Sequence, residues 1–509
     1  SLHCLFALHR IHTDRDLQPA QALIAIADFL STSDAWKDSP MNSPDTITNE
    51  PVTPEQVLLE AEAPVEHDLI YGLEDRPPVR ESIFAAIQHV FACFVGIITP
   101  SLIISGALGL EPADGAYLVS MSLFVSGIAT FIQAKTIGPV GSGLLSIQGT
   151  SFAFIGPVIA AGAAVTAAGG TPQDALGTIF GMCLIGSFIE MFLSRFIELA
   201  SKIITPLVTG VVVTLIGLTL VNVGITSMGG GFGAREAGTF GSPANLLLAG
   251  LVLAIIVALN NVGSSFLRMS SVAIALIVGY LVAIPMGLVS FSNLSNLAPI
   301  TVPIPFRYGF GFNLAAFIPF AFLFLITTIE SIGDLTATSM LTGQPITGKK
   351  YFGRIKGGVL GDGVNSGIAA IFNTFPNTTF SQNNGVIQLT GIGSRYVGYF
   401  IAVIFVILGL VPVIAGVFQT IPQPVLGGAT IIMFGSVAVA GLKIISTVNL
   451  DKRASIILAT SLALGLGVSV VPDILEQLPT LLKSIFASGI STGGITALVL
   501  NIILPGARE

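Results

Sequence analysis

Two acidic residues within an apolar stretch are the clearest candidates for chemistry in this chain. Glu330 and Asp334 lie in the run 312–338 and are four residues apart, so they share one face of a helix. A charge at the centre of a bilayer costs at least roughly 2.5–3.5 kcal/mol, so acidic residues there are functional by default. Two carboxylates that approach each other in a low dielectric repel, and one of them tends to hold a proton. The pair therefore predicts a group that binds and releases protons.

A polar run, Pro376–Gly391, interrupts the apolar sequence a little further on, and it is rich in amides and hydroxyls. Unsatisfied polar groups in lipid cost several kcal/mol each, so such a segment must be buried in protein or line a cavity. Transporters bind their cargo at segments of this kind. Ser146–Phe154 is likewise rich in polar and small residues, and its Thr and Phe residues favour an extended backbone. Each segment is predicted to be a short strand followed by a half-helix, the two pairing with each other.

The remaining candidates for chemistry are few. Glu190 lies little more than one turn from Arg195, which favours a structural role, and His89 is the one histidine within the apolar runs. The three cysteines, one of them Cys4, indicate no disulfide framework. No Cys/His metal spacing and no nucleophile–base pair is apparent, so we expect no catalytic residue, no metal and no cofactor other than a coupling proton.

Composition sets the class of protein. Hydrophobic residues make up 52% of the chain and charged residues 10%. The acidic charge is concentrated in residues 1–83, which hold 15 of the 28 Asp and Glu residues. The apolar remainder predicts an integral membrane protein, and the net charge of −7 gives no indication of nucleic-acid binding. Residues 1–75 are expected to be a polar, disordered, cytoplasmic tail, of which 1–40 could be upstream sequence.

The apolar sequence from Ser82 onward divides into runs of spanning length. With the N-terminal tail in the cytoplasm, fifteen Lys and Arg residues fall on the cytoplasmic side and three on the other. This bias supports an even number of spans with both ends cytoplasmic. The fourteen expected runs are 84–109, 115–134, 139–166, 173–194, 203–225, 244–262, 270–290, 312–338, 357–373, 378–392, 396–414, 421–440, 454–471 and 480–504.

An internal repeat appears in the fifth and twelfth runs. Pro206, Gly210 and Gly217 recur as Pro424, Gly428 and Gly435, at a constant offset of 218. Seven spans per copy is an odd number, so the second copy must be inverted in the membrane. Inverted repeats place the substrate at the midplane, between broken elements from each copy. The third and tenth runs, which contain the two polar segments, are the expected broken elements.

The polar run resembles the signature of the nucleobase–ascorbate transporters. The similar residues are Gln382-Asn383-Asn384-Gly385, four further residues, and Thr390-Gly391. The likeness extends over roughly residues 72–506 and includes Ser142–Gln148, Glu330–Thr338 and Lys356–Leu360. It is closest to the proton-coupled bacterial permeases for xanthine and uric acid. The resemblance implies an all-α fold of fourteen spans in two inverted halves, located in the bacterial inner membrane.

The resemblance also implies a division into two domains that move against each other in an elevator-like way, and a homodimer. Spans 1–4 (residues 76–200) and 8–11 (310–415) would form a core domain. Spans 5–7 (201–295) and 12–14 (420–505) would form a gate domain. The implied partners are a small purine and the lipid bilayer.

Three positions of the resemblance suit a neutral, planar oxopurine. Glu330 matches the carboxylate that holds the purine, and it can accept hydrogen bonds from ring N–H groups. Gln382 can pair with an amide edge of the ring. Phe152 offers a stacking face, although packing in the core is the ordinary role of a phenylalanine. Gln382 stands where uracil permeases of the family generally have a carboxylate, so purines with a 2,6-dioxo edge are favoured over uracil.

The resemblance gives the other residues supporting roles. Asp334 matches a position tied to proton coupling. The alternative role is structural, in which Glu330 and Asp334 only join helices. Asp362 matches an essential carboxylate, for coupling or for architecture. His89 is expected to make an orienting hydrogen bond in the core rather than to contact the ligand. Asn383 matches a residue important for affinity, which also suits bracing of the loop.

Two further positions complete the expected substrate site. The backbone near Ser381 would donate to the purine, as would the backbone beside Phe152. Ser151 stands where xanthine-selective relatives tend to have Asn, and a smaller hydroxyl side chain favours acceptance of uric acid. Its alternative role is packing alone.

The alternative functions include one close to the favoured function and two from other functional classes. They are a permease for uracil or another nucleobase, an anion transporter or channel-like protein of the related fold, and an intramembrane enzyme or scaffold. Anion transporters generally lack the glutamate and the Gln-Asn motif.

Overall fold

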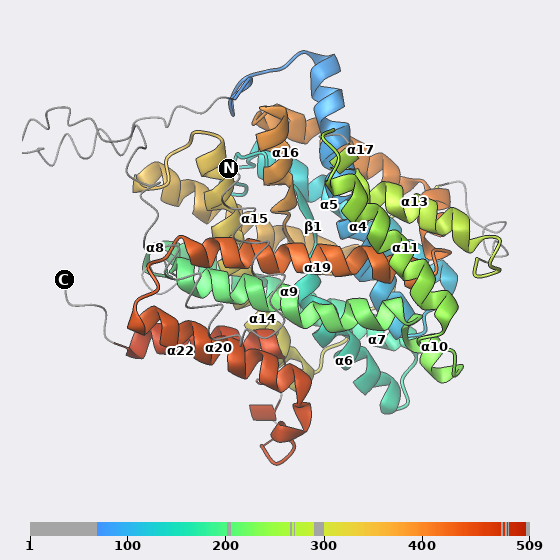
Figure 1. The fold of residues 1–509 in the computed structure, drawn as a ribbon. Helices are drawn as coiled ribbons and strands as arrows, with labels where there is room; N and C mark the ends of the chain where they lie inside the picture. Colours follow the sequence, from blue (N-terminus) through green and yellow to red (C-terminus); the bar gives the residue numbers. More distant parts are fainter. Residues whose placement is uncertain are drawn as a thin grey trace, which may run out of the picture. The chain divides into compact units, whose positions relative to one another are not determined.

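The computed structural model describes residues 69–200, 205–264, 267, 268, 270–289, 300–479, 482, 483, 486 and 488–504. Most of the expected N-terminal tail lies outside these residues. The described part is predominantly helical, with one small sheet (Figure 1). Its elements are α4 (Val79–Ala107), α5 (Pro112–Lys135), β1 (Gln148–Thr150), η2 (Phe152–Phe154), α6 (Ile155–Ala167), α7 (Pro172–Leu193), η3 (Ser194–Phe196), α8 (Ile197–Ala200), α9 (Pro206–Met228), α10 (Gly231–Glu236), α11 (Pro243–Asn260), α13 (Ser271–Ala283), α14 (Leu314–Leu341), α15 (Gly348–Ile371), β2 (Asn377–Thr379), α16 (Gln382–Thr390), α17 (Arg395–Leu410), α18 (Pro412–Gln419), α19 (Gln423–Ser446), α20 (Lys452–Val470), η4 (Pro472–Leu475) and α22 (Gly489–Ile503).

The helices agree with a polytopic membrane protein. Within the described residues, eight helices are long and apolar enough to cross a bilayer. The number is nine if α17 and α18, which meet at a bend of 73°, form one span. Shorter apolar helices include α13 and α22. Each of the fourteen expected runs contains at least one helix or strand. The number of spans stays a prediction, because several of these elements are too short or too polar to cross a bilayer by themselves.

The two polar segments pair with each other in a two-stranded antiparallel sheet, β1 with β2. In its register Gln148 is opposite Thr379 and Thr150 is opposite Asn377. A half-helix follows each strand, since α6 comes after β1 and η2, and α16 comes after β2. The expected strand-and-half-helix arrangement is therefore present. Pairing the strands satisfies backbone groups that a broken helix would otherwise leave exposed at this depth.

The repeat-bearing helices α9 and α19 lie alongside each other (Figure 1). A methyl group at Gly217 would lie 2.6 Å from the carbonyl oxygen of Phe434, and one at Gly210 would lie 3.0 Å from the carbonyl oxygen of Gly441. As the residue number rises along α9, the residue number of the contacted position on α19 falls. The two helices are therefore antiparallel. Copies inverted in the membrane would pair in this way.

Helices α4 and α5 pack against β1, and α14 and α15 pack against β2. Helix α7 packs on α14 and α15, and α17 packs on α4 and α5. Close contacts between backbones hold α5 to α17, since a methyl group at Gly127 would lie 2.6 Å from the carbonyl oxygen of Ala402. Helices α11, α20 and α22 instead pack on the α9–α19 pair. The small sheet lies with the first of these two groups of helices. The division into core and gate domains stays a prediction.

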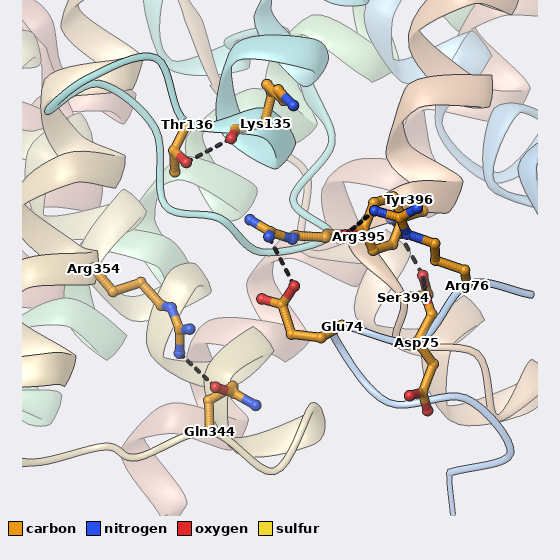
Figure 2. A network of polar contacts seen from close by, with 10 residues as sticks. All are labelled: Glu74, Asp75, Arg76, Lys135, Thr136, Gln344, Arg354, Ser394, Arg395 and Tyr396. Carbon is orange, nitrogen blue, oxygen red and sulfur yellow. Dashed lines mark hydrogen bonds and ion pairs between the residues drawn. The ribbon is translucent and has the colours of Figure 1, made fainter.

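Residues 69–76 form a strap against the turn between α16 and α17, rather than part of a free tail. The backbone N–H of Tyr71 donates to Gly391, and that of Gly393 donates to Tyr71. Figure 2 shows the neighbouring side chains, where Glu74 pairs with Arg395 at 2.7 Å. Residues 69–75 of the expected tail are therefore bound to this turn, and residues 1–68 lie outside the described residues. The physical reason is that this acidic stretch can pair its backbone and one carboxylate with the turn.

Candidate functional site

A narrow cavity brings several of the expected site residues together. It lies between α14, the turn of β2 into α16, η2 and the α9–α19 pair, and its volume is about 30 Å³. That is far below the roughly 300–1,000 Å³ of ordinary ligand pockets, so a purine does not fit without movement of the walls. The lining residues are Phe152, Ala153, Val213, Ile216, Glu330, Asp334, Thr378, Thr379, Phe380, Ser381, Gln382 and Val437.

The two carboxylates of α14 both reach this cavity, as their i, i+4 spacing predicts. One oxygen of Glu330, Oε2, is buried without a hydrogen-bond partner among the described residues. Asp334 is held from β2, since the hydroxyl of Thr379 donates to its Oδ2 at 2.7 Å. Glu330 therefore has an acceptor available for a ligand, whereas Asp334 is fixed by the sheet.

His89 and Asn383 lie behind the cavity and contact each other. The Nδ1 atom of His89 lies 2.9 Å from Oδ1 of Asn383, and both side chains are buried. The other ring nitrogen of His89 has no partner among the described residues. Neither residue lines the cavity. The pair links α4 to the first turn of α16, which braces the segment that presents Gln382.

Asp362 is also buried outside the cavity, and α5 holds it. The Nε2 atom of Gln133 donates to Oδ1 of Asp362 at 2.7 Å and to the carbonyl oxygen of Gly358 at 2.8 Å. The Oε1 atom of Gln133 accepts from the backbone N–H of Ser142 at 2.9 Å. Asp362 therefore belongs to a network that ties α5 and α15 together, and it has no direct access to the ligand in this conformation.

Ser151 and Phe152 occupy the turn that follows β1. The hydroxyl oxygen of Ser151 accepts from the backbone N–H of Ala153 at 3.3 Å, and the side chain is 1% exposed. Phe152 lines the cavity and packs edge-on against Phe434, with ring centroids 5.3 Å apart. Phe152 combines the two roles weighed for it, packing and exposure to the site. Ser151 caps the turn and does not line the cavity.

Sequence reasoning did not single out several residues of the site. Thr379 and Gln133 fix the two aspartates, and Val213, Ile216 and Val437 close the cavity from α9 and α19. Thr379 lies within the polar run, and its hydroxyl was the available signal. In the sequence, the three aliphatic residues look like the other apolar residues of α9 and α19. The internal repeat on these two helices was the one sequence signal for the surface that they form.

A larger cavity of about 560 Å³ adjoins the narrow one, and Ala153 lines both. Its walls come from α6, α9, the start of α14 and the ends of α20 and α22. Asn222 and Ser488 are among its polar lining residues. Its size lies in the range of small-molecule sites.

A multi-pass helical bundle with a broken-element cavity at its centre is the architecture of a membrane transporter. A family model described as "Permease family" matches residues 80–474. The chain belongs to this family, the nucleobase–ascorbate transporters, and is a transporter rather than an enzyme.

The chain is similar to several curated permeases over nearly their whole length. It is 52% identical to the xanthine permease XanP of Escherichia coli K12 over 443 residues, which cover 87% of this chain and 96% of that protein. It is 47% identical to the xanthine permease XanQ of the same organism, with coverage of 86% and 94%. A xanthine permease of Bacillus subtilis is 36% identical, with coverage of 83% and 93%.

Solved structures of anion transporters share the fold. The transmembrane domain of the cyanobacterial bicarbonate transporter BicA aligns with a TM-score of 0.50 at 14% identity, over 85% of this chain and all of that one. Murine Slc26a9 aligns with a TM-score of 0.53 at 11% identity, over 94% of this chain and 74% of that one. At these identities the likeness concerns the fold alone.

Proposed function

We propose that this protein is a proton-coupled symporter for purines with a 2,6-dioxo edge, chiefly xanthine. The observation that carries the proposal is the meeting of Glu330, Gln382 and Phe152 at one cavity, from three different elements. Glu330 accepts from ring N–H groups, Gln382 pairs with the amide edge, and Phe152 stacks on the ring. The similarity to xanthine permeases over most of the chain supports this substrate.

The proton enters the proposal through Glu330 and Asp334, which line the same cavity. A neutral purine brings no charge, so the two carboxylates must be compensated by protons while the site crosses the membrane. Binding of one proton with each purine would allow the proton gradient to drive uptake. We propose no other coupling ion and no cofactor.

Movement of a core domain against a gate domain supplies the access. In the narrow cavity, α14, η2 and α16 face Val213, Ile216 and Val437 of α9 and α19. Because the space between them is about 30 Å³, these two groups must separate to admit a purine. The larger cavity, which shares Ala153, is the proposed path of approach. Elevator-like motion, a homodimer and cytoplasmic ends in an inner membrane complete the proposal.

Uptake by cells that lack their own purine permeases tests the function. Labelled xanthine should accumulate without sodium and should cease to accumulate with a protonophore. Competition by xanthine, hypoxanthine, guanine and uracil should rank xanthine first, because an amide at Gln382 both donates and accepts. Uracil outcompeting xanthine would point to the pyrimidine permease, and currents that depend on anions would point to an anion transporter.

Uric acid is a second proposed substrate, and Ser151 is the residue that would admit it. Its hydroxyl oxygen accepts from Ala153, and its O–H would donate to the ligand only after the walls separate, because Ser151 does not line the narrow cavity in this conformation. Uric acid has an added oxygen at C8, and a site that relieves a clash and adds a hydrogen bond shifts preference by about 1–3 kcal/mol. Ser151→Asn should therefore reduce competition by urate while sparing xanthine uptake. Equal inhibition by urate in both proteins would assign Ser151 to packing only.

A further inference from the structure

Glu190 on α7 is a buried carboxylic acid that the proposed substrate cavity does not include. Its side chain is 1% exposed, and neither carboxyl oxygen has a hydrogen-bond partner among the described residues. Arg195, its neighbour in sequence, is exposed and makes no ion pair with it. An ionised carboxylate left in this position would be strongly unfavourable, so burial of Glu190 requires an explanation other than an ion pair.

The packing of α7 places the turn that contains Glu190 against the turn of α15 that contains Asp362. A methyl group at Gly363 would lie 2.8 Å from the backbone nitrogen of Met191 and 3.1 Å from the carbonyl oxygen of Ser187. The turn of α7 that contains Glu190 is therefore in direct contact with the residue that follows Asp362. On a neighbouring face of α7, a methyl group at Gly186 would overlap the ring of Phe324 on α14. Glu190 thus lies where α7 meets both α15 and α14.

The carboxylates that act on Glu190 come from these two helices. They are Asp362, in the turn of α15 that α7 contacts, and Glu330 on α14. Asp362 retains one oxygen, Oδ2, without a partner among the described residues, and the hydroxyl of Ser331, next to Glu330, is likewise unpartnered. Polar atoms without a hydrogen-bond partner among the described residues are therefore present at Glu190, at Asp362 and next to Glu330.

Among the described residues, the helices around this cluster offer it no compensating cation. Lys135 of α5, the helix whose Gln133 binds Asp362, is exposed and lies over the ring of Tyr399. Helices α7 and α14 contain no Lys or Arg, and α6 contains no titratable side chain. The basic residues of α15 are near its start, where Arg354 binds Gln344 and Lys356 binds Glu198. Asp334, the remaining carboxylate of α14, is held by Thr379. Three carboxyl groups in one buried, uncompensated cluster cannot all be ionised, so the cluster holds protons.

We propose that Glu190 is a proton-handling residue of the transporter, which acts on the substrate site through Asp362. A proton leaves the Glu190 carboxyl group and bonds to an oxygen of the Asp362 carboxylate, or returns, so the total charge of the pair is unchanged. The position of that proton sets the field at Glu330 when the purine binds. The inference rests on the proton-coupled transport proposed above, and Glu190 is a positioning residue without contact to the purine.

Replacement of Glu190 by glutamine tests the role, because the shape is kept and the titratable proton is lost. Glu190→Gln should leave xanthine binding by purified protein within about threefold of wild type and should move the pH midpoint of uptake by about one unit. Glu198→Gln is the matched control, since Glu198 is an exposed glutamate near the end of the same region, and its pH profile should match wild type.

The outcomes separate the two proposals. A wild-type pH profile in Glu190→Gln overturns the role of Glu190 alone, whereas absence of proton-driven xanthine uptake by the wild type overturns the proposed function as well. If Glu190→Gln is not recovered from the membrane, Glu190→Asp replaces it, because it keeps a carboxyl group but withdraws it by one methylene. A shifted midpoint in that variant supports the proposal, and an unchanged midpoint contradicts it.

Discussion

Glu330→Gln should weaken xanthine binding strongly and reduce uptake with it, whereas Asp334→Asn should mainly abolish accumulation against a gradient. Both residues line the cavity, but their surroundings differ. Glu330 has an unpartnered oxygen for the ligand, and Asp334 accepts from Thr379. A hydrogen bond to a charged group contributes about 1.5–3 kcal/mol. Glutamine is uncharged and places an NH2 donor where one carboxylate oxygen accepted, so binding should weaken by roughly 10- to 150-fold. Asparagine at 334 still accepts from Thr379 but cannot carry the proton.

Equilibrium binding of labelled xanthine and its accumulation in energised vesicles measure the two effects separately. In Asp334→Asn, binding and exchange should be less affected than accumulation. Equal losses in both measurements would make Asp334 part of the binding site. Glu198→Gln again serves as the control, because an exposed ion pair such as Glu198–Lys356 contributes little and lies away from the cavity.

Gly217→Val should prevent α9 and α19 from packing and should remove most folded protein from the membrane. A Cβ atom at Gly217 would lie 2.6 Å from the carbonyl oxygen of Phe434 and 2.7 Å from the Cα atom of Ala438. Overpacking among side chains typically costs about 1–3 kcal/mol. The cost here should be larger, because the obstructing atoms belong to the backbone of α19 and cannot rotate away.

The internal repeat provides the control for this substitution. Gly435 is the counterpart of Gly217 in the second copy, and a Cβ atom there would meet no atom within 4 Å. Gly435→Val has the same change in helix propensity and volume, so it should leave thermal stability and uptake near wild type. Expression, monodispersity in detergent and the melting temperature of the purified variants are the measurements. Equal stability of the two variants would contradict the close packing of α9 on α19.

The sequence alone determined the class of protein and the elements of its site. The apolar runs could be located because a bilayer demands uninterrupted apolar helices of a fixed length. Pro376–Gly391 and Ser146–Phe154 could be predicted as paired, broken elements because polar backbone survives at this depth only when it is satisfied within the protein. The spacing of Glu330 and Asp334 placed both on one helical face, and both line the cavity.

Only the tertiary structure decided which of the other polar residues face the cavity. Asp362, His89 and Asn383 are buried away from it. Their hydrogen-bond partners come from helices distant in sequence, so these contacts could not be predicted from the sequence. Val213, Ile216 and Val437 close the site, but aliphatic residues in apolar helices carry no signal of their orientation toward a ligand. Nearness in sequence suggested that Glu190 belongs with Arg195. Two residues more than one helical turn apart need not be in contact, however, and Arg195 is exposed. The packing of α7 on α15 and α14 instead places Glu190 with the carboxylates of the core.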